Sequence, residues 1–184
     1  MRLASVITPF NDRNLALAAQ TGVTDITVRY QGPELADWLP AREQVERHGL
    51  KICTVEDALQ TDEIIMGTEG RDEEIEAIEQ LLQIMSELEI PVLCYNFMAG
   101  TDWVRTSVNE PERGGARVTG FDLAAVDQAV SLDDASRQLE HREISADQLW
   151  ENLEYFLAAV IPEAERQGIA LAMHPDDPPL DVFM

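Results

Sequence analysis

Residues 50–97, LKICTVEDALQTDEIIMGTEGRDEEIEAIEQLLQIMSELEIPVLCYNF, decide the fold class because a helical segment lies between two short apolar runs. The runs 50–57 and 91–97 have the length of strands that are covered on both faces of a sheet. Residues 71–89 predict a helix, because apolar side chains recur every three or four positions and form one stripe: Ile75, Ile78, Leu82 and Met85, joined by Leu81 and Leu88. Strand, helix and strand in this order predict a parallel sheet with a right-handed crossover.

The same alternation precedes this unit. We expect strands within residues 2–10 and 23–30, and helices over 11–20 and 34–48. Gly22 is placed to end the first of these helices. Pro40 interrupts the second, and either divides it into two pieces or begins a new helix at its first position.

A further helix and strand follow residue 144. Ser145 begins the helix, with Gln148 at the spacing of a capping box. Pro162 predicts a kink in this helix, and Gly168 predicts its end. Residues 169–173, IALAM, then predict a fifth strand.

About five β/α units are therefore visible. The first strand lacks a glycine-rich phosphate-binding motif, which disfavours a dinucleotide-binding sheet. The pattern favours the (β/α)8 TIM-barrel type in an incomplete form, because a whole barrel takes about 250 residues and this chain has 184. We expect a single partial barrel domain over residues 1–184 with an inserted loop region at about 98–143, in which 122–130 and 133–141 could form short helices.

Composition limits the partners of the protein. There are 13 Lys and Arg residues against 35 Asp and Glu residues, which gives a formal net charge of −22. Such a charge disfavours nucleic acids and anionic membranes. The sequence also lacks a signal-peptide core and an apolar run of about 18 residues, so we expect a cytoplasmic protein. Lys51 is the only lysine, and this acid-rich, lysine-poor composition resembles that of halophilic proteins, with an acidic mesophilic protein as the alternative.

The two cysteines, Cys53 and Cys94, both lie in apolar runs. They predict buried thiols that pack as small apolar groups, in preference to a disulfide or a redox pair.

In parallel α/β folds the functional groups lie beyond the carboxyl ends of the strands. These positions carry polar side chains: Asn11, Arg29 with Tyr30, Glu56 with Asp57, Asn96, and His174 with Asp176 and Asp177. Pro175 favours an extended backbone at His174 and so restricts where the imidazole points. An imidazole beside carboxylates is suited to Mn²⁺, Fe²⁺ or Zn²⁺, whereas a proline-rich turn with solvated aspartates is the alternative interpretation.

Residues 95–107, YNFMAGTDWVRTS, form the second dense segment. Asn96 and Asp102 can hydrogen-bond to hydroxyl groups, and Arg105 can bind a carboxylate through two N–H groups. An anionic substrate needs a local cation in a chain of this charge, so Arg105 is a candidate for binding it. In the alternative, the segment is a structural loop in which Arg105 pairs with a neighbouring acid.

Two segments resemble the mannonate dehydratase family. They are CYNFMAGTDWVRTS with the later GFD at 120–122, and LWENLEYFLAAVIPEAERQGIALAMHPDDPP at 149–179. The N-terminal stretch TPFNDRNLALAAQTGVTDITV resembles the first unit of the family less strongly. The resemblance implies a xylose-isomerase-like TIM barrel that dehydrates D-mannonate to 2-keto-3-deoxy-D-gluconate with Mn²⁺ or Fe²⁺.

The resemblance also implies roles for individual residues. It assigns His174 as a metal ligand, with the remaining ligands on later strands that this chain lacks. For the expected reaction, the residue types lead us to assign Arg105 with Asn96 and Asp102 to binding the small anionic sugar acid, and Asp176 and Asp177 to catalysis or orientation.

The chain also departs from the family. Relatives carry a histidine-bearing segment after the second strand and a VESxPxH-like stretch after the third, where this chain has VRYQG and VEDALQTDE. Two alternatives therefore stay open: a sugar isomerase or epimerase of other specificity, and a non-catalytic remnant. Open sheet edges in a partial barrel would favour association into a homo-oligomer.

Overall fold

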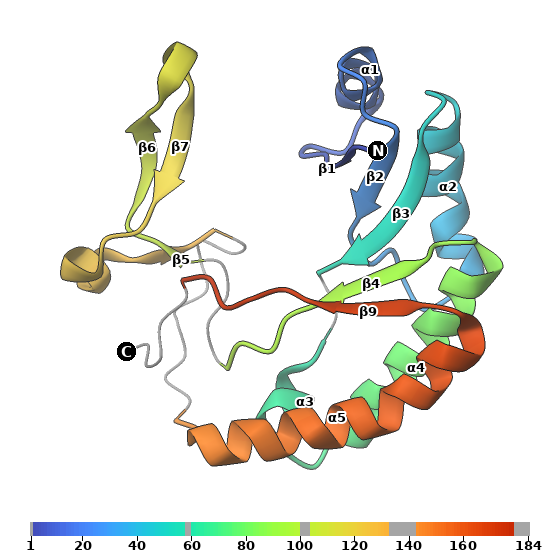
Figure 1. The fold of residues 1–184 in the computed structure, drawn as a ribbon, viewed down its shortest axis with the longest axis vertical. Helices are drawn as coiled ribbons and strands as arrows, with labels where there is room; N and C mark the ends of the chain where they lie inside the picture. The colour runs from blue at the N-terminus through green and yellow to red at the C-terminus, as the bar shows by residue number, and fades with distance from the viewer. Residues whose placement is uncertain (1, 58–59, 100–103, 133–142, 179–184) are drawn as a thin grey trace.

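The computed structural model describes residues 2–57, 60–99, 104–132 and 143–178, and its main element is a curved parallel sheet (Figure 1). Five strands form this sheet: β1 Ala4–Val6, β2 Asp25–Val28, β3 Lys51–Glu56, β4 Val92–Tyr95 and β9 Ala170–Met173. They lie in the order β1-β2-β3-β4-β9, and each neighbouring pair is parallel. The prediction of five β/α units of a partial barrel is confirmed.

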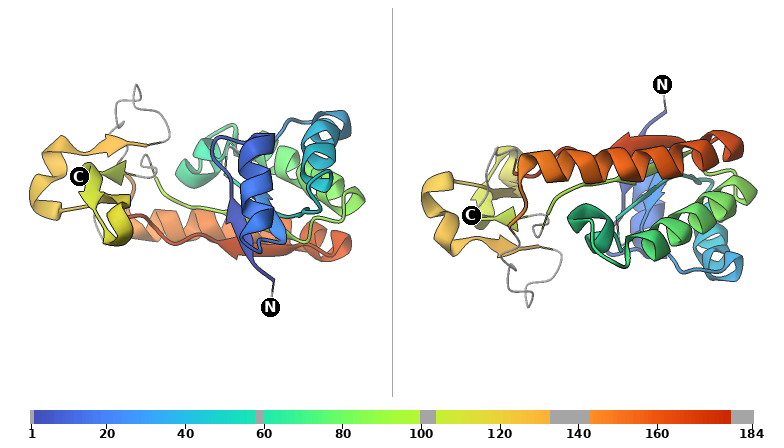
Figure 2. Two further views of the ribbon diagram at one scale, coloured as in Figure 1. Left: turned by 90° about the horizontal axis from the view of Figure 1, so that it is seen from above. Right: turned by 90° about the horizontal axis from the view of Figure 1, so that it is seen from below.

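Helices alternate with the strands and lie along the outer face of the sheet (Figures 1 and 2). They are α1 Asp12–Gln20, α2 Leu35–Glu46, α3 Asp62–Met66, α4 Arg71–Glu87 and α5 Ala146–Gln167. The predicted ends of α5 are confirmed. The Gln148 N–H donates to Ser145 Oγ at 3.2 Å, and Gly168 ends the helix with a left-handed φ of 71°.

The two prolines do not divide their helices. Helix α2 runs unbroken through Pro40, so the predictions of two pieces or of a new start at Pro40 are both wrong. Contacts earlier in the helix explain this: the Glu34 N–H donates to Asp37 Oδ2 at 3.0 Å, and the fully buried Trp38 donates from Nε1 to the Gly32 carbonyl at 2.9 Å. This anchoring offsets the one backbone hydrogen bond that Pro40 removes. Helix α5 likewise continues through Pro162.

Helix α3 is an element that the sequence pattern did not reveal. It has 5 residues, too few for an apolar periodicity to be recognised. Its Ile64 and Ile65 are buried, and the Ile64 N–H donates to Glu74 Oε2 at 3.0 Å. Tertiary contacts with α4 and α5 therefore hold this short helix in place.

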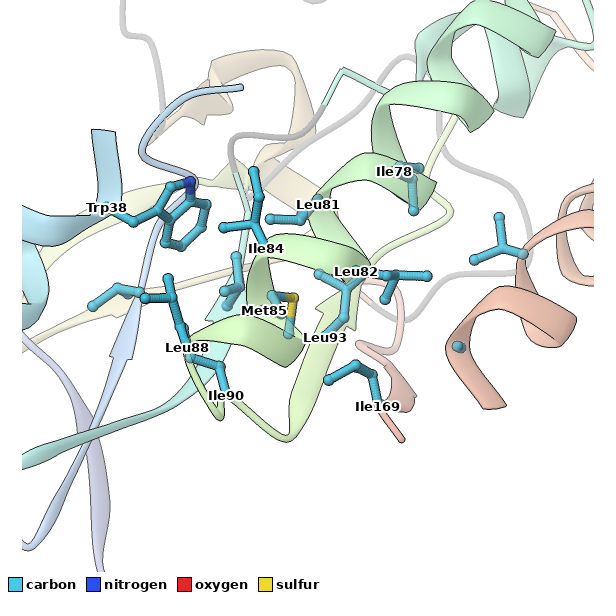
Figure 3. Close-up of a cluster of buried hydrophobic side chains, with 14 of the residues drawn as sticks. Trp38, Ile78, Leu81, Leu82, Ile84, Met85, Leu88, Ile90, Leu93 and Ile169 are labelled. Atoms are coloured by element: carbon cyan, nitrogen blue, oxygen red, sulfur yellow. The ribbon is translucent and has the colours of Figure 1, made fainter. Parts of the chain in front are cut away.

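The hydrophobic core lies between the sheet and the helices on its outer face (Figure 3). Helix α4 contributes the predicted stripe, of which Ile78, Leu82 and Met85 are almost completely buried. Leu93 of β4 and Ile169, just before β9, are buried in the same cluster. The strand side chains that face the helices thus stabilise the sheet, which leaves the strand ends available for polar groups.

The segment between β4 and α5 forms two small antiparallel pairs. Strand β5, Val104–Arg105, pairs with β8, Val130–Ser131, and β6, Ser107–Pro111, pairs with β7, Arg117–Gly120. The β6–β7 hairpin, with the 3-10 turn η1 Arg113–Gly115 at its tip, stands apart from the main sheet (Figure 1). These strands were not predicted, because their residues are mostly exposed and lack an apolar alternation.

Two short helices were predicted within this segment, and the structure describes one of them. The expected helix over 122–130 is the 3-10 helix η2, Leu123–Gln128. The expected helix over 133–141 lies outside the described residues. No helix in the described part of the chain is long and apolar enough to span a membrane.

Candidate active site

The carboxyl ends of the parallel strands meet around one pocket. The strand register places Glu56 beside Cys94 and Tyr95 beside Met173, so residues that follow the strands lie close together. The pocket has a volume of about 210 Å³. The polar residues that line it include Arg29, Glu56, Cys94, Asn96, His174 and Asp177. The pocket thus lies at the carboxyl edge of the sheet, where functional groups lie in parallel α/β folds.

His174 is held by two short contacts. Its backbone N–H donates to the Tyr95 carbonyl at 2.7 Å, which extends the pairing of β9 with β4. Its ring Nδ1 lies 2.7 Å from the Pro175 carbonyl oxygen. Because a carbonyl only accepts, Nδ1 carries the proton in this contact, and Nε2 keeps a lone pair in the neutral ring. In this tautomer an imidazole can ligate a metal ion through Nε2.

A complete metal site is not assembled by the described residues. Within the ranges that the structure describes, no group of three or more His, Cys, Asp or Glu side chains is close enough to hold a metal ion. His174 could therefore supply one ligand of a metal ion, but the described residues do not form a whole coordination sphere.

Arg105 and Asp177 form a two-pronged ion pair. Arg105 Nη1 donates to Asp177 Oδ1 at 2.9 Å, and Nη2 donates to Oδ2 at 2.7 Å. Arg105 also donates to Thr119 Oγ1 at 3.0 Å and to the Val104 carbonyl at 2.8 Å. Its side chain is 14% exposed, and Arg105 is not among the residues that line the pocket. The pair links β5 of the inserted segment to the loop after β9.

The other predicted site residues are placed differently. Asn96 lines the pocket, and its Oδ1 accepts the Met98 N–H at 3.5 Å. Asp177 lines the pocket beside it. Asp176 is exposed and outside the lining residues. Asp102 lies outside the described residues, so its predicted contact with substrate hydroxyls has no structural description.

Cys94 belongs to the pocket, which the sequence analysis did not anticipate. Its Sγ lies 3.9 Å from Glu56 Oε1. Burial raises the pKa of the Cys94 thiol, and the negative charge of Glu56 raises it further. Both Cys53 and Cys94 are free thiols, as predicted, although each is only half-buried. The alternation of β4, with Leu93 facing the core and Cys94 facing the pocket, could have identified Cys94.

Arg29 is a second pocket residue to which the sequence analysis gave no role, although it was noted at the end of the second strand. It directly follows β2, lines the pocket and forms an ion pair with Asp57, which directly follows β3. The Asp57 backbone has a left-handed φ of 69°, which is unusual for a residue other than glycine. Their positions after neighbouring strands were visible in the sequence, but their pairing was not.

Comparison with known proteins identifies the family. Residues 13–184 match the family model described as D-mannonate dehydratase (UxuA). A mannonate dehydratase from Streptococcus pneumoniae is 35% identical over 180 residues, covering 89% of this chain and 49% of that protein. A mannonate dehydratase from Streptococcus equi subsp. zooepidemicus is 36% identical over 180 residues, with the same coverage of 89% and 49%. The chain spans about half the length of these relatives.

Solved structures agree with this assignment. The crystal structure of a mannonate dehydratase from Streptococcus suis superposes with a TM-score of 0.82 at 29% identity, covering 100% of this chain and 56% of that chain. A D-psicose 3-epimerase from Clostridium cellulolyticum superposes with a TM-score of 0.58 at 10% identity, covering 95% and 52%, which supports the barrel fold alone. From the family match and these similarities, we conclude that the chain belongs to the D-mannonate dehydratase family.

Proposed function

We propose that this chain supplies part of the active site of a metal-dependent D-mannonate dehydratase, a hydro-lyase that converts D-mannonate into 2-keto-3-deoxy-D-gluconate and water. The observation that carries the proposal is His174. In a chain of this family, it lines a pocket formed by the carboxyl ends of five barrel strands, and the contact of its Nδ1 with the Pro175 carbonyl favours the tautomer with a free Nε2 lone pair. We take residues 1–184 as one partial barrel domain with an insertion at about 98–143.

The proposed reaction has requirements that the pocket residues can partly meet. Dehydration removes the proton at C2, next to the carboxylate, and the hydroxyl group at C3 leaves. The enediolate charge that develops is stabilised by positive groups. Asn96, at the pocket wall, is suited to hydrogen-bond a substrate hydroxyl. We place Arg105 as an aid to substrate binding that acts through Asp177, because Asp177 lines the pocket and Arg105 holds both of its oxygens.

The described residues provide neither a complete metal site nor an assigned general acid and base. We propose Mn²⁺ or Fe²⁺ with His174 as one ligand, and the metal, once bound, would polarise the substrate oxygens. Since the described residues do not complete its coordination, no reaction step is derived through it. Asp177, at the pocket, is better placed for a catalytic or orienting role than Asp176, which is exposed.

The test combines metal binding with product analysis. We expect the chain to bind Mn²⁺, monitored by electron paramagnetic resonance, and His174→Ala to weaken this binding at least about tenfold. The mass of any product from D-mannonate distinguishes dehydration, by the loss of water, from isomerisation. Mn²⁺ binding that is unchanged in His174→Ala would contradict the proposed ligand. Dehydration only by a longer chain that contains these residues would support the family function and show that the present half is insufficient alone.

A sugar isomerase or epimerase of other specificity is the second candidate. The segment VRYQG at the end of β2 favours it, because this segment holds no histidine, whereas the family resemblance led us to expect one. A substrate panel separates the two functions, because this alternative requires a ketose to react while D-mannonate stays inert.

Further properties are proposals from composition and topology. The end strands β1 and β9 each have one neighbour in the five-stranded order, which favours association into a homo-oligomer. A monomer by light scattering would contradict it, and would also count against a non-catalytic remnant that depends on a partner. The charge of −22 disfavours binding to nucleic acid and to anionic membranes and is compatible with a halophilic source, and we propose a cytoplasmic location.

A further inference from the structure

Arg29 occupies a special place in the charge distribution of the pocket. Of the described residues that line it, Arg29 alone is an arginine or lysine, and the others include the three acids Glu56, Asp57 and Asp177. In a chain with a net charge of −22, these acids repel an incoming carboxylate. An anionic sugar acid that enters this pocket therefore needs a positive group at the pocket wall.

Arg105, the cation that the sequence favoured for this role, is engaged elsewhere. Its two terminal nitrogens hold Asp177, and its Nε donates to Thr119. The Arg105 side chain is 14% exposed, whereas that of Arg29 is 41% exposed. A substrate carboxylate can therefore reach Arg29 more readily than Arg105.

Asp57 pairs with Arg29 at the pocket wall. The two residues follow neighbouring strands, and the Tyr30 N–H donates to the Asp57 carbonyl at 3.3 Å, which ties the ends of β2 and β3 together. Asp57 adopts a left-handed backbone conformation at this point, as residues held for a function often do. A guanidinium has five N–H donors, so a bond to one carboxylate leaves donors for a second.

We propose that Arg29 binds the carboxylate of the substrate and that Asp57 positions it, so that this pair sets the preference for sugar acids over neutral sugars. The proposal rests on the proposed function, because it takes an anionic sugar acid as the ligand. It assigns Arg29 a direct contact with the ligand and Asp57 a positioning role.

The experiment compares D-mannonate with a neutral polyol that lacks only its carboxylate, and with a second acid that differs from it at C2. D-mannonate, D-gluconate and D-mannitol, in which a hydroxymethyl group replaces the carboxylate of mannonate, are titrated into the full chain by calorimetry. The variants are Arg29→Gln, Arg29→Lys and Asp57→Asn, with Arg113→Gln as a control that removes the same charge from the exposed tip of the β6–β7 hairpin. Circular dichroism checks that each variant is folded.

We expect Arg29→Gln to weaken binding of the acids by about 10- to 100-fold, with D-mannitol binding unchanged. Arg29→Lys should lie between, because it keeps the charge and loses the planar fork. Asp57→Asn removes a repelling charge but also releases Arg29 from its position, so it should weaken acid binding less than Arg29→Gln does. Arg113→Gln should stay within about twofold of the wild type.

The outcomes separate this inference from the proposed function. A preference for D-mannonate over D-mannitol that survives in Arg29→Gln would overturn the role of Arg29 and leave the mannonate function standing. An Arg29-dependent preference for D-gluconate alone would support Arg29 and contradict mannonate as the substrate. A wild-type chain that prefers neither acid to D-mannitol, or an equal loss in Arg113→Gln, would overturn the inference.

Discussion

Strand β2 has an arginine–aspartate ion pair at each end, and the two pairs differ in their surroundings. At the amino end, Asp25 pairs with Arg2, and the Asp25 side chain is 2% exposed. At the carboxyl end, Arg29 pairs with Asp57 beside the pocket, and their side chains are 41% and 26% exposed. The same chemistry thus serves stability at one edge of the sheet and, in our proposal, ligand recognition at the other.

Burial explains the difference. A carboxylate that is removed from water must be fully hydrogen-bonded, and Asp25 accepts bonds from Arg2 Nε at 2.9 Å and Thr24 Oγ1 at 2.6 Å. Asp57 keeps access to solvent, so its pairing with Arg29 can be exchanged for other partners at little cost. The role of an ion pair in a barrel therefore depends both on the edge of the sheet at which it lies and on its exposure to solvent.

The largest expected effect on stability comes from the hydrophobic core, which supports both the amino and the carboxyl edge of the sheet. Leu93 is completely buried in β4, so Leu93→Ala should lower the free energy of unfolding by about 3 kcal/mol. Leu123→Ala is the matched control, because Leu123 is 58% exposed and its loss should change stability by less than about 0.5 kcal/mol. Urea denaturation followed by circular dichroism measures both. Equal losses would mean that the inserted segment is as tightly packed as the barrel.

Replacing the acid of each pair tests the comparison directly. Asp25→Asn should lower the free energy of unfolding by about 2 kcal/mol, because a buried charged acceptor is lost. The loss stays below that for a fully buried pair, because Arg2 is 65% exposed and can be hydrated. Asp57→Asn should change stability by less than about 0.5 kcal/mol, since the pair is partly exposed and asparagine tolerates the left-handed backbone. The same urea denaturation serves here, and an equal loss in both variants would break the comparison.

The amino-end pair should also depend on pH. The hydrogen bond from Arg2 holds the pKa of Asp25 below its ordinary value of 3.8. Because the folded-state pKa is lowered, the ionised carboxylate stabilises the protein above about pH 3.8, and this stability is lost as the pH falls through the folded-state pKa. The stability difference between wild type and Asp25→Asn should therefore be constant near neutral pH and shrink below pH 3.8. A stability difference at pH 2.5 that is as large as the difference at neutral pH, measured by urea titration, would contradict this prediction.

The smallest effect concerns the thiol at the carboxyl edge. Burial, and then the charge of Glu56, raise the pKa of Cys94, so its alkylation by iodoacetamide at pH 8 should be slower than that of glutathione. Glu56→Gln removes the second of these causes and should accelerate Cys94 alkylation by about twofold. Mass spectrometry of the labelled peptides follows Cys94, with Cys53 as an internal control. An equal acceleration at both cysteines would indicate general opening of the fold instead.

Much of the fold could be predicted because long elements carry repeated signals. The stripe of α4, the Ser145 cap and the Gly168 stop of α5 all reflect local chemistry that a sequence displays. The uninterrupted α2 and the short α3 could not be predicted in this way. Pro40 is tolerated because Trp38 is anchored in the core, and α3 is held by α4 and α5, so both outcomes depend on contacts between distant residues.

The site was predicted in part for the same reason. The position of a residue after a strand was enough to bring Asn96, His174 and Asp177 to one pocket. The partner of a charged side chain was not predictable. Arg105, which the sequence favoured as the direct carboxylate binder, is paired with Asp177, 72 positions later in the chain. Arg29 lines the pocket, but the sequence alone had given it no role.

The sequence by itself determined the alternation of strands and helices, the membership of the barrel class and the edge at which polar groups collect. Hydrophobic periodicity, caps and strand ends are local properties, and each can be recognised within a few neighbouring residues. Only the tertiary structure decided which arginine faces the pocket, which aspartate is buried and which cysteine lies beside Glu56. These properties depend on distances between residues far apart in the chain, and such distances are set by packing.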